Sequence, residues 1–261
     1  MSELLLELRE VTVPLRSRVE EPSLTDVNWS VRPGEFWVLG GHHGSGTSDL
    51  LLMLAGLAKP LAGTYTLFNQ DMGEHFGDKF LPHRLRLGLV FEEARLFHDQ
   101  TLAENIALPA RYHHNLTPDE AEGWVGALLQ ATELTPLAGQ TPSMVGRRWR
   151  RRAALARALA LRPEVLFLEN PLRGLDARDG AWWVTFVQQL WRGHDLMRGQ
   201  PMTVIASTDE FRPWRESGAQ FAVLHGGTLR VAGDGASLDD VTMAHLAPTT
   251  LEEDTQWQFK T

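Results

Sequence analysis

The stretch from residue 35 to residue 58 limits the fold more than any other part of the sequence. Residues 35–40 form a short apolar run, typical of a buried strand, and glycine-rich sequence follows it. Leu50, Leu51, Leu54 and Leu57 then recur at helical spacing. Strand, glycine-rich loop and helix in this order predict an α/β fold whose loop offers backbone N–H groups to an anion. A turn that only starts a helix is the alternative interpretation.

The loop matches the phosphate-binding pattern G-x-x-x-x-G-K-[ST] at every defining position except one. Its candidate nucleotide-binding residues are Gly41, Gly44, Ser45, Gly46, Thr47 and Ser48. Thr47 stands where the pattern has lysine, so the ammonium group that reaches the terminal phosphates is missing. Because a charge-assisted hydrogen bond contributes roughly 1.5–3 kcal/mol, we expect triphosphate binding to weaken about ten- to hundredfold. Asp49 adds a negative charge that would repel an anionic ligand.

Apolar patterning predicts alternating strands and helices along the rest of the chain. Strands are expected at residues 4–13, 63–68, 87–91, 165–168 and 202–206, and a hairpin over residues 221–231. Helices are expected at residues 102–138, 148–161 and 180–191. Residues 14–25, with two prolines and several charges, predict a loop. Lys59 and Pro60 are expected to end the helix that follows the glycine-rich loop.

Composition excludes several classes of protein. The chain has 261 residues and a formal net charge of -8, and this acidic balance argues against non-specific nucleic-acid binding. With no cysteine, it can form neither a disulfide nor a thiolate metal site. The longest apolar stretch, residues 50–58, is shorter than the roughly 20 residues that span a bilayer. We therefore expect a chain that does not itself cross a membrane.

Several further segments follow one another in an order known from a single family. They are residues 33–35, 87–92 with 96–97 and 101–106, 153–160, 165–171, 175–176 and 204–209. In this order they resemble the nucleotide-binding subunit of ABC transporters. The segments correspond to the approach to the P-loop, the Q-loop region, the helix after the signature motif, the Walker B strand, the D-loop and the switch region. The resemblance covers roughly the first 235 residues.

This resemblance implies a P-loop NTPase-like ABC ATPase fold with an antiparallel β subdomain and an inserted helical subdomain. A single domain is expected over residues 1–247, with the helical subdomain at about residues 93–150 and a polar C-terminal tail over residues 248–261. Arg151, Arg152 and the Leu96–Phe97 segment are most similar to the ATPase subunit of Mla or MCE-type phospholipid transporters.

Departures from the family pattern fall on the residues that carry its chemistry. The resemblance places Glu92 at the Q-loop glutamine and Glu169 at the Walker B aspartate, so the vestigial magnesium positions are Ser48, Glu92 and Glu169. Asn170 stands at the catalytic glutamate and Thr208 at the switch histidine, which leaves no catalytic residue. We therefore expect no bound cofactor beyond weak MgATP.

The signature motif aligns with residues 145–149, which include Gly146, Arg147 and Arg148. Two arginines at the start of a helix oppose its dipole, a cost that an anion would remove. They indicate either the terminal phosphate of a partner's nucleotide or acidic side chains of a partner. A solvated basic helix face is the alternative interpretation. Asp176 corresponds to the D-loop aspartate.

The leading hypothesis is a catalytically inactive ABC ATPase-like subunit of a membrane transport complex. It would pair with a second ABC ATPase subunit, as a homodimer or heterodimer, and lie at the cytoplasmic face of the inner or plasma membrane as a peripheral protein. A membrane permease subunit would dock around Phe91, Glu92, Leu96 and Phe97. One alternative is a working ATPase in which Glu92 or Glu169 serves as the magnesium ligand and an arginine replaces the lysine. A second is a soluble regulatory scaffold that uses the same dimer surface.

Overall fold

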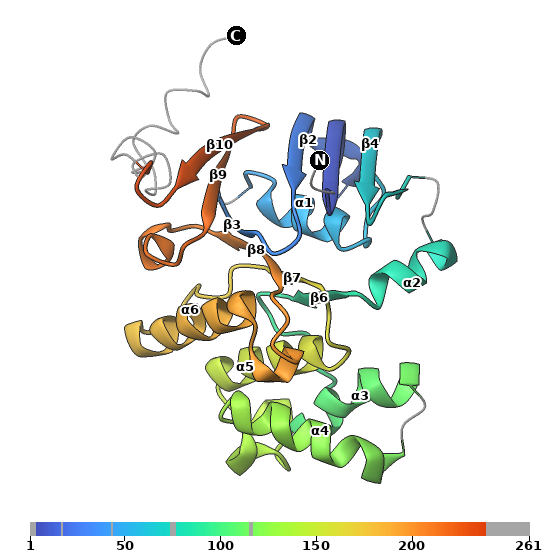
Figure 1. The fold of residues 1–261 in the computed structure, drawn as a ribbon, viewed down its shortest axis with the longest axis vertical. Helices are drawn as coiled ribbons and strands as arrows, with labels where there is room; N and C mark the ends of the chain where they lie inside the picture. Colours follow the sequence, from blue (N-terminus) through green and yellow to red (C-terminus); the bar gives the residue numbers. More distant parts are fainter. Residues whose placement is uncertain (1–3, 17, 43, 74–76, 115–116, 239–261) are drawn as a thin grey trace.

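Two β-sheets with a helix between them organise the computed structural model, which describes residues 4–16, 18–42, 44–73, 77–114 and 117–238 (Figure 1). The first sheet is antiparallel, in the order β2 (Arg18–Val31), β1 (Leu6–Leu15), β4 (Ala62–Leu67) and β5 (Gln70–Asp71). Helix α1 (Thr47–Leu54) lies between this sheet and the second one. Apolar side chains from both sheets and from α1 form one continuous core.

The second sheet has six strands and positions the candidate site. Its order is β10 (Thr228–Asp234), β9 (Gln220–His225), β3 (Phe36–Gly40), β8 (Thr203–Thr208), β7 (Val165–Leu168) and β6 (Leu87–Val90). All neighbours are parallel except the hairpin β9–β10. Every residue of β7 is buried, which confirms a central strand covered on both faces. Because parallel strands end at the same edge, the residues after β3, β6, β7 and β8 meet there.

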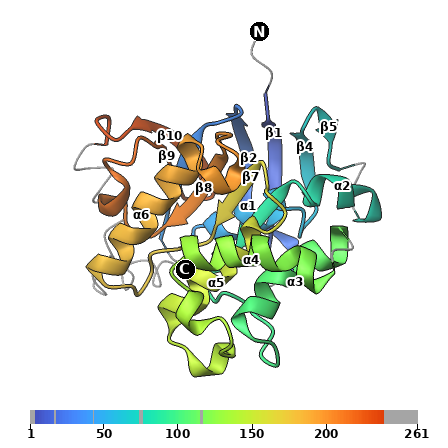
Figure 2. The same cartoon turned by 60° about the horizontal axis from the view of Figure 1, so that its bottom comes forward.

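Helices cover the other face of the six-stranded sheet (Figure 2). Of these, α5 (Arg147–Leu159) and α6 (Ala177–Arg192) pack against the sheet, and α3 (Leu102–His114) and α4 (Pro118–Ala131) pack on α5. The short α2 (Leu81–Arg84) precedes β6. In α6, Trp183, Phe186, Val187 and Leu190 are buried at the i, i+3, i+4, i+7 spacing of a helix with one apolar face. Figure 1 shows α3 and α4 at the end of the molecule farthest from the four-stranded sheet.

The structure corrects two expectations about element boundaries. The loop predicted for residues 14–25 is wrong, because β1 and β2 form a long hairpin in which Pro14 lies opposite Pro22. Register shifts in this hairpin accommodate the prolines, which cannot donate to a regular ladder. Helix α1 ends at Leu54 rather than near Lys59, since Gly56 adopts a φ of 73°, in the left-handed region that ends helices. The polar tail expected over residues 248–261 lies outside the described residues.

None of the helices in the described part of the chain combines the length and apolar character needed to cross a bilayer. Residues 50–58 form the last part of α1 and the turn that follows it.

Candidate functional site

The glycine-rich loop leads from the end of β3 into α1. Gly44 and Gly46 have φ angles of 83° and 90°, a left-handed conformation that glycine adopts without a Cβ penalty. A Cβ at Gly46 would approach the side chain of Leu24 to 2.8 Å, so the close contact with β2 also requires glycine. No described side chain caps α1, which leaves the N–H groups of its first turn directed at the loop.

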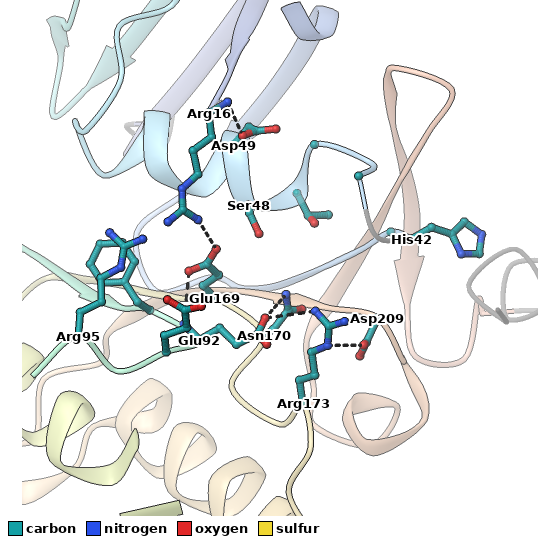
Figure 3. A pocket seen from close by; sticks show the side chains of 16 residues that line it. Arg16, His42, Ser48, Asp49, Glu92, Arg95, Glu169, Asn170, Arg173 and Asp209 are labelled. Carbon is teal, nitrogen blue, oxygen red and sulfur yellow. Dashed lines mark hydrogen bonds and ion pairs between the residues drawn. The ribbon is translucent and has the colours of Figure 1, made fainter. Parts of the chain in front are cut away.

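A cleft of about 360 Å³ lies between this loop and the ends of β6, β7 and β8 (Figure 3). Of the expected site residues it brings together Gly41, Gly44, Gly46, Thr47, Ser48, Phe91, Glu92, Glu169 and Asn170. It also contains five charged residues that the sequence interpretation did not assign to it: Arg16, Glu93, Arg95, Arg173 and Asp209. The volume falls within the range of about 300–1,000 Å³ that is usual for small-ligand sites. Its chemistry, rather than its size, therefore decides what it can bind.

Arg16 directly follows β1, and its side chain reaches across the cleft (Figure 3). Its backbone N–H donates to Oδ1 of Asp49 at 2.9 Å. Its guanidinium Nη1 lies 3.5 Å from Oε1 of Glu169, whose side chain is almost fully buried. A cation of the chain itself therefore faces the carboxylate that resembles the Walker B acid.

A second arginine joins the ends of three strands on the opposite side of the cleft. Nη1 of Arg173 lies 3.4 Å from Oε2 of Glu92, and its Nε lies 3.6 Å from Oδ2 of Asp209. The same Glu92 oxygen accepts a hydrogen bond from Nδ2 of Asn170 at 3.2 Å. The backbone N–H of Glu92 in turn donates to Oε2 of Glu169 at 3.3 Å. These contacts provide both carboxylates with donors from within the chain.

This donor set does not fit Mg²⁺. Magnesium requires near-octahedral oxygen ligands at about 2.0–2.1 Å. In nucleotide sites it is usually held by one or two carboxylates together with phosphate oxygens and water, so the contacts of Glu92 and Glu169 decide whether it fits. Glu169 and Glu92 face arginine and amide donors instead. Five carboxylates and three arginines line the cleft, so a triphosphate without its metal would meet an excess of negative charge.

Neither of the two positions expected to be degenerate supplies a general base. Asn170 donates from its side chain to Glu92, and an uncharged amide cannot take a proton from water at neutral pH. The Thr208 hydroxyl donates to the carbonyl of Glu210 at 2.7 Å, and Thr208 is not among the residues that line the cleft. Ser45 also lies outside that lining. The side chains present can hold and orient ligands, but these two cannot activate water.

The arginines of the signature region lie at the start of α5. Nη1 of Arg148 is 3.6 Å from Oδ2 of Asp179, so the anionic neighbour expected for Arg148 belongs to the same chain. Arg147 is exposed and makes no ion pair with any described residue, and its Nη1 would lie 3.0 Å from a Cβ added at Gly174, near the D-loop. Gly146 precedes α5 without a side-chain cap from the described residues. Of these two arginines, Arg147 is the one without an ion pair to a described residue, and we expect it to be the better placed for an anion of a partner.

The structure places the four expected docking residues in different surroundings. Leu96 is only 7% exposed and packs in the core, whereas Phe97 is 51% exposed. The guanidinium of Arg95 covers the ring of Phe91 at 4.0 Å, and Glu92 is engaged inside the cleft. Of the four residues, only Phe97 presents a large apolar side chain to solvent. The spacing of residues 91–97 could not show this, because the backbone at Ala94 and Arg95 has positive φ angles.

Arg151 connects the two strand ends that carry the cleft carboxylates. This residue is 1% exposed and donates to the carbonyls of Glu92, Pro171 and Arg173 at 2.9, 3.1 and 2.5 Å. Burial lowers the pKa of the Arg151 guanidinium from its ordinary value, although an arginine remains charged at neutral pH. The residue therefore fixes the geometry of the cleft from behind without entering it.

A family model for ABC transporters matches residues 24–173, which is more than half of the chain. The chain belongs to the ABC transporter family. The match covers β3, the glycine-rich loop, α1, β6, α5 and β7, the elements that build most of the cleft. It was the order of these segments, more than any single residue, that the sequence interpretation relied on.

Among curated relatives, the chain is 29% identical over 231 residues to the methionine import ATP-binding protein MetN 2 of Pseudomonas aeruginosa, covering 88% of this chain and 66% of that protein. It is 37% identical over 164 residues to the sulfate/thiosulfate import ATP-binding protein CysA 1 of Agrobacterium fabrum, covering 60% of this chain and 45% of that protein. The chain thus spans less than two thirds of the length of either relative.

Solved structures agree with the fold. A dimeric post-hydrolysis state of the ATP-binding cassette MJ0796, bound to ADP and Pi, matches with a TM-score of 0.78 and 26% identity, over 87% of this chain and 98% of that chain. The structure of cbiO1 from Clostridium perfringens, part of the ABC transporter complex cbiONQ, matches with a TM-score of 0.77 and 19% identity over 98% of both chains. The P-loop ABC ATPase fold, with its antiparallel sheet and helical part, is confirmed.

Proposed function

We propose that this chain is a catalytically inactive ABC ATPase-like subunit of a membrane transport complex. The observation that carries the proposal is the state of the cleft: Arg16 and Arg173 of the same chain pair with the carboxylates that would hold the metal. Asn170 stands where a general base would be needed. Hydrolysis in this fold depends on positioning and charge stabilisation around an attacking water, and loss of a general base alone typically costs about 100- to 10,000-fold.

The subunit acts by association. In this proposal it pairs with a second ABC ATPase subunit through the surface that carries Arg147 and Asp176, and it docks on a permease near the exposed Phe97. It lies as a peripheral protein at the cytoplasmic face of the membrane. The dimeric MJ0796 cassette supports pairing as a property of this fold. We propose a lipid as the cargo, because Arg151, Arg152 and residues 96–97 are similar to the ATPase subunit of phospholipid transporters. The relatives MetN 2 and CysA 1 are named for other cargoes.

An active enzyme is the second candidate. This alternative requires an arginine to take the place of the missing lysine. Arg16 is a cleft arginine on the loop side, and this observation favours the alternative. Its guanidinium is, however, paired with Glu169, and Arg173 is paired with Glu92, so both candidate metal ligands of this alternative face an arginine. One residue cannot both neutralise Glu169 and leave it free for a cation. The inactive subunit therefore accounts for the geometry better.

Turnover of MgATP by the purified chain tests the proposal. We expect no hydrolysis above the background of a mock preparation, and no change when Asn170→Ala or Glu169→Ala is introduced. Turnover at rates typical of the family that disappears in both variants would refute the proposal. Affinity purification from native membranes tests association separately: a polytopic membrane protein should copurify, whereas its consistent absence would favour the soluble scaffold.

A further inference from the structure

Resting on the proposed function, we propose that Arg16 and Arg173 replace the divalent cation in the cleft and exclude it. The two guanidinium groups neutralise the carboxylates that a metal would otherwise need. The cleft consequently keeps its arrangement without metal or nucleotide.

The contacts of the two carboxylates carry this inference. Glu169 has Nη1 of Arg16 at one oxygen, at 3.5 Å, and the backbone N–H of Glu92 at the other, at 3.3 Å. Oε2 of Glu92 receives both Nδ2 of Asn170 and Nη1 of Arg173. Figure 3 shows these side chains converging on the middle of the cleft from opposite sides. A metal that bound Oε1 of Glu169 or Oε2 of Glu92 would have to displace a positively charged side chain.

The arginines are also held where they are. The N–H of Arg16 is fixed by Asp49, so its side chain starts from a defined point beside α1. Arg173 is held by Asp209 through Nε and by Arg151, which binds the Arg173 carbonyl. An arginine does not lose its proton at physiological pH, so this exclusion does not titrate away.

Four segments are joined in this way. Arg16 links the end of β1 to the end of β7, and Arg173 links the loop after β7 to the ends of β6 and β8. Because Arg16 and Arg173 are themselves 46% and 43% exposed, each pair contributes little to stability by itself. Together the pairs connect the ends of β1, β6, β7 and β8. Their main effect is therefore on which ions the cleft accepts rather than on the stability of the fold.

Manganese binding followed by electron paramagnetic resonance tests the inference on the whole chain. Wild type and the control Arg9→Ala, which loses an exposed ion pair to Glu7 on β1, should show no saturable Mn²⁺ site. The double variant Arg16→Ala/Arg173→Ala should gain one, with an affinity about tenfold or more above the weakest binding that would still be detected in wild type. Adding Glu169→Gln to the double variant should remove the gained site.

Three results would overturn the inference. They are a saturable Mn²⁺ site in wild type that Glu169→Gln removes, a folded double variant that gains no site, and a gained site that persists with Glu169→Gln. Circular dichroism establishes folding; if the double variant does not fold, Arg16→Gln, which keeps a polar side chain, is measured for the same gain. Turnover by wild type would refute the proposed function, whereas these manganese results without turnover would refute only the exclusion of the cation.

Discussion

Arginines perform two different tasks in two neighbouring regions of this molecule. Arg151 and Arg152, here called the framework arginines, are 1% and 3% exposed and bind carbonyls and the buried carboxylate of Asp179. Arg16 and Arg173, here called the cleft arginines, have side chains that are 46% and 43% exposed and face carboxylates in an open cleft. The first pair is needed by the fold. The second pair faces the carboxylates of the cleft, and in the function that we propose it substitutes for the charge of a ligand.

The largest expected effect lies in the framework. Arg151→Met keeps much of the volume but leaves three carbonyls without a charged donor, and we expect a loss of about 3–4 kcal/mol in the free energy of unfolding. Urea denaturation followed by circular dichroism measures it. Arg147→Met, an exposed residue on the same helix, is the matched control. A loss no larger than that of the control would end the distinction between the two pairs.

The next effect concerns the partner of Arg152. Asp179→Ala leaves a buried guanidinium with only Glu133, whose side chain is half-exposed, and we expect a loss of about 2–3 kcal/mol. The exposed Glu122→Ala on α4 serves as the control in the same urea titration. Equal unfolding midpoints for both variants would show that the buried pair contributes nothing.

A smaller effect is expected at the start of α3, in the helical layer. Thr101 and Glu104 cap each other reciprocally, and Thr101→Ala should cost about 1 kcal/mol. Hydrogen bonds from the Thr101 backbone and side chain lower the pKa of Glu104. The stabilisation from a lowered carboxyl pKa is present above its unfolded value and is lost as pH falls through the folded value. The difference between variant and wild type should therefore shrink in acid; a difference that grows would contradict this cap.

The smallest effect on stability belongs to the cleft. Arg173→Ala removes contacts to Glu92 and Asp209, but these pairs are half-exposed, and we expect a loss of about 0–1 kcal/mol. Measured beside Arg151→Met, it sharpens the comparison. Arg173 lies in the loop after β7 and Arg151 donates to carbonyls of the same loop, yet the two losses of stability should differ by several-fold. A loss as large as that of Arg151→Met would place Arg173 in the framework.

Most of the fold followed from patterns that act over short distances. The apolar run of β7, the spacing of α6 and the glycine turn of β9–β10 were all predicted because their burial depends on neighbours in the sequence. Residues 14–25 were misread because the pairing of β1 with β2 overrides the local preference of two prolines. The buried position of Leu96 was missed for a similar reason, since it depends on the packing of other segments.

The candidate site was predictable in its loop and strand ends but not in its charges. Substitution of the lysine by Thr47 and the acids Glu92 and Glu169 could be read from motif order. Arg16 lies 33 residues before Asp49 and 153 before Glu169, so no spacing rule connects them. Arg173 could have been noticed in the sequence, because it is a long positively charged side chain between the Walker B strand and the D-loop. Its contact with Glu92 could not be predicted, because it depends on two strand ends that meet only in the folded sheet.

The central claim is that the chain's own arginines occupy the charge positions of the metal-bound nucleotide. Titration of the purified chain with MgATP in a calorimeter tests this claim most directly. Our account predicts no saturable heat of binding for wild type, whether or not Mg²⁺ is present. Saturable binding that requires Mg²⁺ and is lost in Glu169→Gln would contradict it.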